Sequence, residues 1–299
     1  MLRQILVKLS ADNFGVKYFL RCIVGIFWIV RLPMLIIIIL TVAVVLRLCE
    51  EVSLSRVVLL SSPLFFLYGG AFALNDIIDR EIDKINLPHR PIPSGLISTW
   101  GGAIVSVFFL FIGIYITASF DRESLCYGLI GVALASMYSF GLKRILVLKN
   151  VLASLLNSSI FVFLSLHIII PEIAWFLFVI TFILCIGREL ILDARDAYGD
   201  AANGIRTVAT ELGVNRTTWL GYFFSSTGIV LSITPCLGHF DIGFKASKNL
   251  IILAFAFLVG GFFFIYCRSC KSQKRLWLLE EYLKIYKLVY VFSLWFLAK

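Results

Sequence analysis

The sequence predicts an all-α membrane protein, a polytopic bundle of about nine transmembrane helices. Of its 299 residues, 60% are hydrophobic and only 15% are charged, whereas soluble domains carry about 25% charged residues. The mean hydropathy is +0.96, and phenylalanine alone occurs 27 times. Long apolar segments recur along the chain, each close to the roughly 20 residues that a membrane-spanning helix needs. Because lipid offers no partner to backbone amides, these segments are expected to be helical.

The chain is predicted to be a single membrane-embedded domain over residues 1–299. It is expected to begin with an interfacial lead-in at 1–23, where charged residues interrupt the apolar pattern and no cleavable signal peptide is evident. Nine candidate spans follow. They lie near 24–46, 57–78, 101–119, 124–142, 151–170, 173–193, 217–236, 249–267 and 279–298. The ninth is the weakest because Lys284 and Lys287 interrupt its first half.

The distribution of Lys and Arg predicts the sidedness of the bundle. With nine spans, the side that holds the N-terminus carries 19 of the 27 basic residues, and the opposite side carries five. Since basic loops stay in the cytoplasm, the N-terminus is expected to be cytoplasmic. The basic residues lie at helix ends rather than in one patch, so the net charge of +9 does not indicate nucleic-acid binding. The seven cysteines are scattered through apolar stretches, as is typical of buried thiols.

Two acidic segments, residues 75–95 and 188–207, are predicted to form polar loops after the second and sixth spans. Each contains the pattern D-x-x-D-x-x-x-D, which on a helix places three carboxylates on one face. The carboxylates are Asp76, Asp79 and Asp83 in the first segment and Asp193, Asp196 and Asp200 in the second. A constant offset of 117 residues relates the two sets, and Asn86 and Asn203 share it. This register suggests two related halves.

Three carboxylates on one helix face repel one another unless a cation binds. Acidic groups at the end of a span are costly to desolvate and so indicate function. Clustered hard oxygen ligands suit Mg²⁺, which shares its coordination sphere with substrate phosphates. We therefore expect all six Asp residues to be catalytic and to grip one diphosphate through bridging Mg²⁺. The alternative is that these are merely solvated acidic helix ends.

Basic and polar residues near the acidic segments are candidates to bind the diphosphate. They are Arg80, Arg90, Tyr138, Lys143, Arg188 and Arg206. Some of the cations could serve only as positive-inside anchors. Arg31, at the edge of the first span, is either an anchor that snorkels to the surface or a contact to the diphosphate or to an acidic acceptor.

These residues resemble the UbiA family of intramembrane prenyltransferases. NDIIDREID followed by NLPHRPIPSG looks like the corresponding segment of chlorophyll synthases and archaeal glycerolipid-forming members. DARDAYGD followed by NGIRT is similar to the family's second Asp-rich loop. YSFGLK resembles its Tyr/Lys element, although Tyr138 and Lys143 are one residue further apart than in several members.

The resemblance implies a nine-helix bundle around a central cavity that opens sideways to lipid. It implies Mg²⁺ as cofactor, with Asn75 and the six Asp residues binding the Mg²⁺-diphosphate and with Lys143 and Arg90 neutralising it. The expected substrates are a polyprenyl diphosphate and a small or lipid acceptor.

The acceptor and the outcome of the reaction stay open at this point. An aromatic acceptor is the first choice, and a chlorophyllide-like or glycerolipid acceptor is the alternative. A terpene cyclase on the same scaffold would let the cation attack its own chain. A cation-coupled transporter also buries acidic residues, but its sites lie near the bilayer midplane on broken helices, whereas these Asp clusters lie at helix ends. The prenyl length, the oligomeric state and the host membrane are not predicted.

Overall fold

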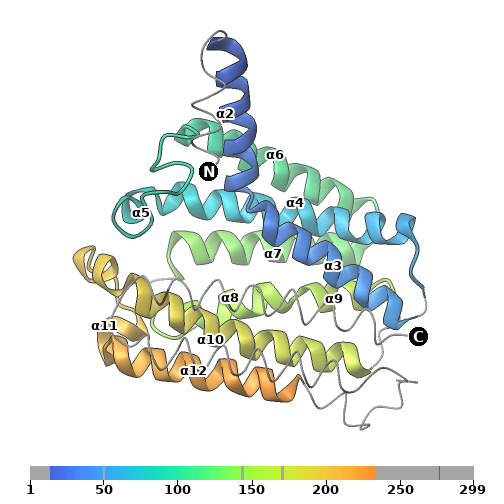
Figure 1. Ribbon diagram of the computed structural model, residues 1–299. Helices are drawn as coiled ribbons and strands as arrows, with labels where there is room; N and C mark the ends of the chain where they lie inside the picture. Colours follow the sequence, from blue (N-terminus) through green and yellow to red (C-terminus); the bar gives the residue numbers. More distant parts are fainter. Residues whose placement is uncertain (1–13, 50, 143–144, 170–171, 233–275, 277–299) are drawn as a thin grey trace.

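Helices make up all the regular structure that the computed structural model describes, which covers residues 14–49, 51–142, 145–169, 172–232 and 276 (Figure 1). The prediction of an all-α bundle is confirmed for this part of the chain. The helices are α2 (Phe14–Ile29), α3 (Leu32–Leu48), α4 (Leu54–Ile78), α5 (Arg80–Asn86), α6 (Thr99–Ala118), α7 (Arg122–Phe140), α8 (Leu148–Ser158), α9 (Ile160–Ser165), α10 (Glu172–Ala202), α11 (Val208–Leu212) and α12 (Val214–Leu231).

Six of the nine predicted spans fall on described helices that are long and apolar enough to cross a membrane. They are α4, α6, α7, the α8–α9 pair, α10, and α2 with α3, a pair bent by 52°. The predicted seventh span begins within α12, which ends at Leu231. The predicted eighth and ninth spans and the first part of the lead-in lie outside the described residues.

The long helices lie side by side, and both acidic segments reach the same end of the bundle (Figure 1). Helix α4 packs against α3, α6 and α7, and α10 packs against α8 and α12. Short helices α5 and α11 follow α4 and α10 at that end, and α5 also contacts α10. The topology thus brings together two chain segments that are more than 100 residues apart.

Small residues allow the main helix pairs to approach closely. Ser106 of α6 donates a hydrogen bond to the carbonyl oxygen of Gly70 in α4 at 2.9 Å. A Cβ added to Gly187 of α10 would lie 2.7 Å from the backbone nitrogen of Ser225 in α12. Helices in lipid associate through such close van der Waals packing and interhelical hydrogen bonds, because lipid is as apolar as their side chains.

Two backbone breaks occupy matching places in the two halves. Arg31 (φ 55°) and Val147 (φ 64°) are the described non-glycine residues with positive φ. Arg31 immediately precedes α3, and α4 with the first acidic segment comes next in the chain. Val147 immediately precedes α8, and α10 with the second acidic segment follows after the short helix α9. The positions are 116 residues apart, one less than the offset between the acidic motifs. The structure therefore supports the suggestion of two related halves.

The second acidic segment is helical over residues 188–202 rather than a loop, which corrects the sequence-based prediction. It forms the last four turns of α10, which runs for 31 residues to Ala202. The chain turns only at Gly204 (φ 66°), where Ile205 N–H bonds to the Asp200 carbonyl at 2.8 Å. Since no earlier residue breaks the helix, the three Asp residues keep their helical spacing. In the first segment, α4 and α5 also extend the helix beyond the expected boundary, to Asn86.

Candidate active site

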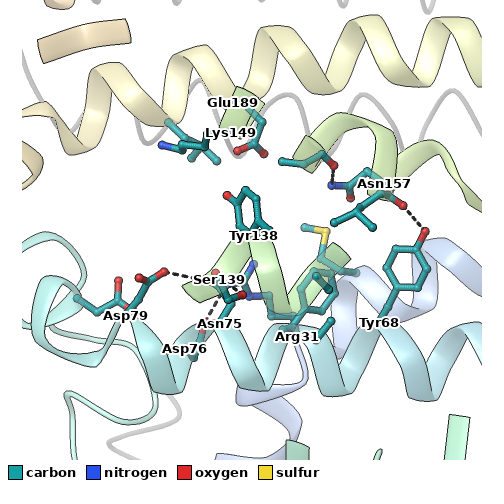
Figure 2. Close-up of a pocket in the computed structure, with 18 of the residues that line it drawn as sticks. Arg31, Tyr68, Asn75, Asp76, Asp79, Tyr138, Ser139, Lys149, Asn157 and Glu189 are labelled. Atoms are coloured by element: carbon teal, nitrogen blue, oxygen red, sulfur yellow. Dashed lines mark hydrogen bonds and ion pairs between the residues drawn. The ribbon is translucent and has the colours of Figure 1, made fainter. Parts of the chain in front are cut away.

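A cavity of about 470 Å³ lies between α4, α7, α8 and α10, and both acidic segments contribute to its wall (Figure 2). This volume is in the range of small-molecule sites, about 300–1,000 Å³. The Asp residues in the wall are Asp76, Asp79, Asp83, Asp196 and Asp200. They lie towards the end of the bundle where α5 begins. Tyr68 lies at the other end of the view in Figure 2, near Asn157.

Two guanidinium groups hold the first acidic motif. Asp76 is only 2% exposed, and its Oδ1 accepts hydrogen bonds from Arg31 Nη2 at 2.8 Å and from Arg90 Nη1 at 3.2 Å. The same Arg90 nitrogen donates to Asp83 Oδ2 at 2.7 Å. Arg31 reaches Asp76 from the break between α2 and α3, and its guanidinium also lies 4.8 Å from the centroid of the Phe72 ring. Buried carboxylates require such partners, because an unpaired buried charge is costly.

The pKa values of Asp83 in α5 and Arg90 in the following turn are shifted because these charged groups are buried close together. Burial raises the pKa of Asp83 to about 6, against the opposing effect of Arg90. For Arg90, burial acts to lower the pKa, but the carboxylates of Asp76 and Asp83 outweigh it and raise the pKa above its usual value. A neighbouring cation such as Arg90 therefore favours the ionised form of Asp83.

The second acidic motif is divided between the cavity wall and the space behind it. Asp193, only 1% exposed, is ion-paired with Lys149 Nζ and accepts a hydrogen bond from Asn150 Nδ2 at 3.1 Å. Asp193 is not part of the cavity wall, although Lys149 is. Arg195 forms a bidentate pair with Asp196, with both nitrogen–oxygen distances at 2.7 Å. Asp196 and Asp200 face the cavity.

A hydrogen bond joins the two acidic segments directly. Asn86 Nδ2, at the end of α5, donates to Asp200 Oδ1 on α10 at 3.3 Å. The approach is close because Gly199 lacks a side chain: a Cβ built there would lie 1.8 Å from Asn86 Oδ1. The carboxylate faces of the two halves therefore meet across one cavity.

Comparison with known proteins identifies this arrangement. The UbiA prenyltransferase family model matches residues 22–287. The chain belongs to the UbiA prenyltransferase family. It is similar to the digeranylgeranylglyceryl phosphate synthase of Methanothrix thermoacetophila, with 32% identity over 68% of this chain and 75% of that protein. The synthase of the same name from Methanoculleus marisnigri is 33% identical over 67% of this chain and 73% of that protein. A solved structure of a UbiA homolog from Archaeoglobus fulgidus, bound to GPP and Mg²⁺, has a TM-score of 0.65 at 18% identity, covering 91% and 99% of the two chains.

Family membership confirms the resemblance read from the acidic motifs, including the closeness to archaeal glycerolipid-forming members. This UbiA prenyltransferase is therefore an enzyme of isoprenoid transfer and an integral, multi-pass membrane protein. The fold of its solved neighbour is shared over almost the whole length of both chains.

The structure gathers most, but not all, of the predicted site residues of this UbiA prenyltransferase. Besides the five Asp residues, the predicted site residues in the cavity wall are Arg31, Asn75, Arg90, Tyr138 and Arg188. Asn75 Nδ2 also donates to Asp79 Oδ2 at 3.0 Å. Asp193 is set behind the wall because Lys149 and Asn150 hold it there. Lys143 lies outside the described residues.

Two predicted cations do not reach the cavity. The side chain of Arg80 is 45% exposed and pairs with its neighbour Glu81. That of Arg206 is 72% exposed and pairs with Glu211 at 2.7 Å. Both are near the acidic motifs in sequence, but Arg80 projects from the start of α5 and Arg206 lies in the segment between α10 and α11, and neither lines the cavity. For these two residues the structure favours the anchor interpretation.

The sequence analysis missed three polar residues of the site. Lys149 and Asn150 lie in the first turn of α8. Lys149 was counted only among the basic residues of the loops, and Asn150 comes just before the predicted span at 151–170. Glu189 lies within the membrane-spanning part of α10 and lines the cavity, yet its place outside the D-x-x-D-x-x-x-D pattern concealed it. The signal that could have found Glu189 is its position, because an acidic residue inside an apolar span is expensive and usually functional.

The donor set suits a divalent cation that is shared with a substrate. Among the described residues, no three Asp, Glu, His or Cys side chains are grouped closely enough to hold a metal ion by themselves. The oxygen-only carboxylates on opposite sides of the cavity nevertheless match the preference of Mg²⁺, which usually takes one or two carboxylates and completes its sphere with substrate phosphates and water. A metal ion here would need diphosphate oxygens as further ligands.

Replacing Gly199 with Ala should reduce prenyl transfer by up to about 100-fold while the protein still folds, because small displacements at a reacting site cost this much. The new methyl group would overlap Asn86, 2.5 Å from its Cγ, and force that side chain off Asp200. Transfer activity and the thermal unfolding midpoint in detergent are the measurements. Ala202→Ser, at the exposed end of the same helix, is the control. An active Gly199→Ala protein would show that the link between the two segments is not needed.

Proposed function

We propose that this UbiA prenyltransferase binds a Mg²⁺-bound polyprenyl diphosphate between α5 and α10 and transfers the prenyl group to a phosphorylated glycerolipid. The observation that carries the proposal is the meeting of two carboxylate faces across one cavity, joined by the Asn86–Asp200 hydrogen bond. A diphosphate placed between these faces can be shared by both. The acidic segments and the N-terminus are proposed to be cytoplasmic, on the strength of the Lys and Arg distribution.

The residues that would hold Mg²⁺ are the carboxylates nearest the end of the bundle, Asp79 and Asp83 on one side and Asp196 and Asp200 on the other. When bound, Mg²⁺ neutralises the charge that develops on the departing diphosphate. Asp76 fixes Arg31 and Arg90 in the wall, and Arg90 in turn orients Asp83. The solved homolog bound to GPP and Mg²⁺ supports this assignment by fold.

The chain's own cations and apolar residues supply the rest of the chemistry. Arg90, Lys149 and Arg188 lie in the wall, where they can stabilise the diphosphate anion as the allylic carbon–oxygen bond breaks. The wall also has apolar residues away from the carboxylates, Leu67 and Leu156 among them. This part excludes water from the carbocation until the acceptor attacks. It also receives the prenyl tail, which gains roughly 0.8 kcal/mol per buried CH₂.

A glycerolipid acceptor is favoured over an aromatic one by the relatives and by the charge of the wall. Both relatives described above are named digeranylgeranylglyceryl phosphate synthases. Arg31 and Arg195 lie in the wall in addition to the three cations assigned to the diphosphate, and guanidinium groups suit an anionic phosphate headgroup. The aromatic acceptor, the first choice from sequence, stays a prediction that the same assay tests.

The test is an incubation of membranes carrying the protein with Mg²⁺, labelled geranylgeranyl diphosphate and separate acceptors. We expect a labelled ether lipid with a prenylated glyceryl phosphate acceptor and none after chelation of Mg²⁺. A labelled aromatic product alone would reassign the acceptor, and a labelled hydrocarbon formed without acceptor would indicate cyclisation. Ion-driven uptake into proteoliposomes, with no diphosphate release under any condition, would contradict the proposal.

A further inference from the structure

Glu189 is a buried acid in the cavity wall that is not among the carboxylates proposed to hold Mg²⁺. It is 6% exposed, lies inside the apolar part of α10 and belongs to neither Asp motif. Its Oε1 accepts a hydrogen bond from Arg188 Nη1 at 3.0 Å. Figure 2 shows its carboxylate directed into the cavity, opposite Tyr138 and beside Lys149.

The position of Glu189 along α10 separates it from the carboxylates that would hold Mg²⁺. At 1.5 Å per residue, it lies about 10 Å deeper along the helix axis than Asp196 and about 16 Å deeper than Asp200. A prenyl diphosphate with its phosphates at the end of the bundle and its tail in the apolar part must place the reacting carbon between these levels. Glu189 therefore lies on the tail side of the carboxylates that would hold Mg²⁺, which is the side on which the reacting carbon lies.

The two related halves differ at this position. The offset of 117 residues that relates the Asp motifs pairs Glu189 with Phe72, which also lines the cavity. One half therefore presents an aromatic ring at this level and the other a carboxylate. An acid within a span is costly, so its presence in only one half indicates a specific task rather than a repeated structural one.

We propose that Glu189 is the general base that removes the proton from the acceptor. The proposal rests on the proposed prenyl transfer. The bond between the allylic carbon and the diphosphate oxygen breaks, and its electron pair leaves with the diphosphate. The acceptor hydroxyl oxygen donates an electron pair to the allylic carbon, forming the ether bond, and its proton passes to the Glu189 carboxylate. Glu189 then gives the proton to the departing diphosphate, so charge and protons balance. An aromatic acceptor would lose its ring proton to the same carboxylate.

The test compares diphosphate release with prenyl transfer in Glu189→Gln, which keeps the shape of the side chain but removes its basicity. General base catalysis contributes about 10²–10⁴-fold, so transfer should fall by at least about 100-fold. Mg²⁺-dependent release of diphosphate should stay near the level of the unchanged protein, because ionisation does not need the base. The labelled product should change from prenylated acceptor to prenyl alcohol, since water then captures the cation.

Three further variants make the result decisive. Glu189→Asp keeps a carboxylate and should recover part of the transfer. Glu172→Gln, exposed at the opposite end of the same helix, should leave both reactions unchanged. Asp196→Asn should lose diphosphate release and transfer together; if it loses neither, the proposed diphosphate site fails independently of Glu189.

Two outcomes would overturn the role of Glu189. One is full transfer by Glu189→Gln. The other is an equal loss of diphosphate release and transfer, which would place Glu189 with the groups that bind the diphosphate or support the fold. If both reactions are lost equally but the thermal unfolding midpoint equals that of the unchanged protein, a role in supporting the fold is excluded.

Discussion

Replacing Asp76 with Asn is expected to abolish prenyl transfer while the protein still inserts into membranes. Asp76 lines the cavity and is the shared acceptor for Arg31 and Arg90. The amide cannot balance two guanidinium groups, so Arg90 loses its fixed position and Asp83 loses the orientation it needs for a metal ion. Removal of one preorganised electrostatic group at a reaction centre typically costs about 10²–10³-fold in rate.

The measurements for Asp76→Asn are diphosphate release and product formation at saturating Mg²⁺. Membrane fractionation and detergent unfolding report insertion and stability. Glu81→Gln is a matched control, because Glu81 is in the adjoining helix α5, its side chain is 62% exposed, and it is not in the cavity wall. Undiminished turnover of Asp76→Asn would remove the first motif from the diphosphate site.

The pair of Lys149 and Asp193 should show a large energetic coupling. Their side chains are 18% and 1% exposed, and breaking a buried ion pair by removing one partner costs about 3–5 kcal/mol. Lys149→Met alone leaves a carboxylate without its cation, and Asp193→Asn alone leaves an ammonium group without its anion. The double variant leaves a neutral amide that can still bond to Asn150, so its loss of stability should be far below the sum of the two single losses.

Denaturant unfolding in detergent micelles measures the three free energies of this double-mutant cycle. Additive losses would show that the contact does not couple the two residues. The double variant also separates stability from chemistry at this pair, in which Asp193 is one of the metal ligands predicted from sequence. Restored stability with normal diphosphate release would assign both Asp193 and Lys149 a structural role, whereas restored stability with no release would place at least one of the two in the diphosphate site.

The amino-acid pattern alone predicts the class of protein, six spans that the structure describes, and the location of both acidic motifs. These depend on local properties. Hydrophobicity over about 20 residues predicts a span, and the spacing of Asp76, Asp79 and Asp83 fixes one helical face wherever the helix lies. The motif resemblance to UbiA prenyltransferases was equally local, because it needed only the order of residues. The predicted sixth span ended near residue 193, where hydrophobicity falls, but α10 continues to Ala202 and the chain turns at Gly204. A polar helix can continue beyond the lipid, so the glycine is the better local signal for the end of this helix.

Which basic side chain contacts which carboxylate depends on the tertiary structure and could not be predicted from the sequence. Arg31 lies 45 residues from Asp76, and Asn86 lies 114 residues from Asp200, yet each pair is in hydrogen-bond contact. Arg80, which is adjacent to Asp79, points away from the cavity. Nearness in sequence fixes the direction of a side chain around its own helix, but contacts between helices depend on how those helices cross. The close crossing of α5 and α10 at Gly199 therefore assembles a site that no single segment contains.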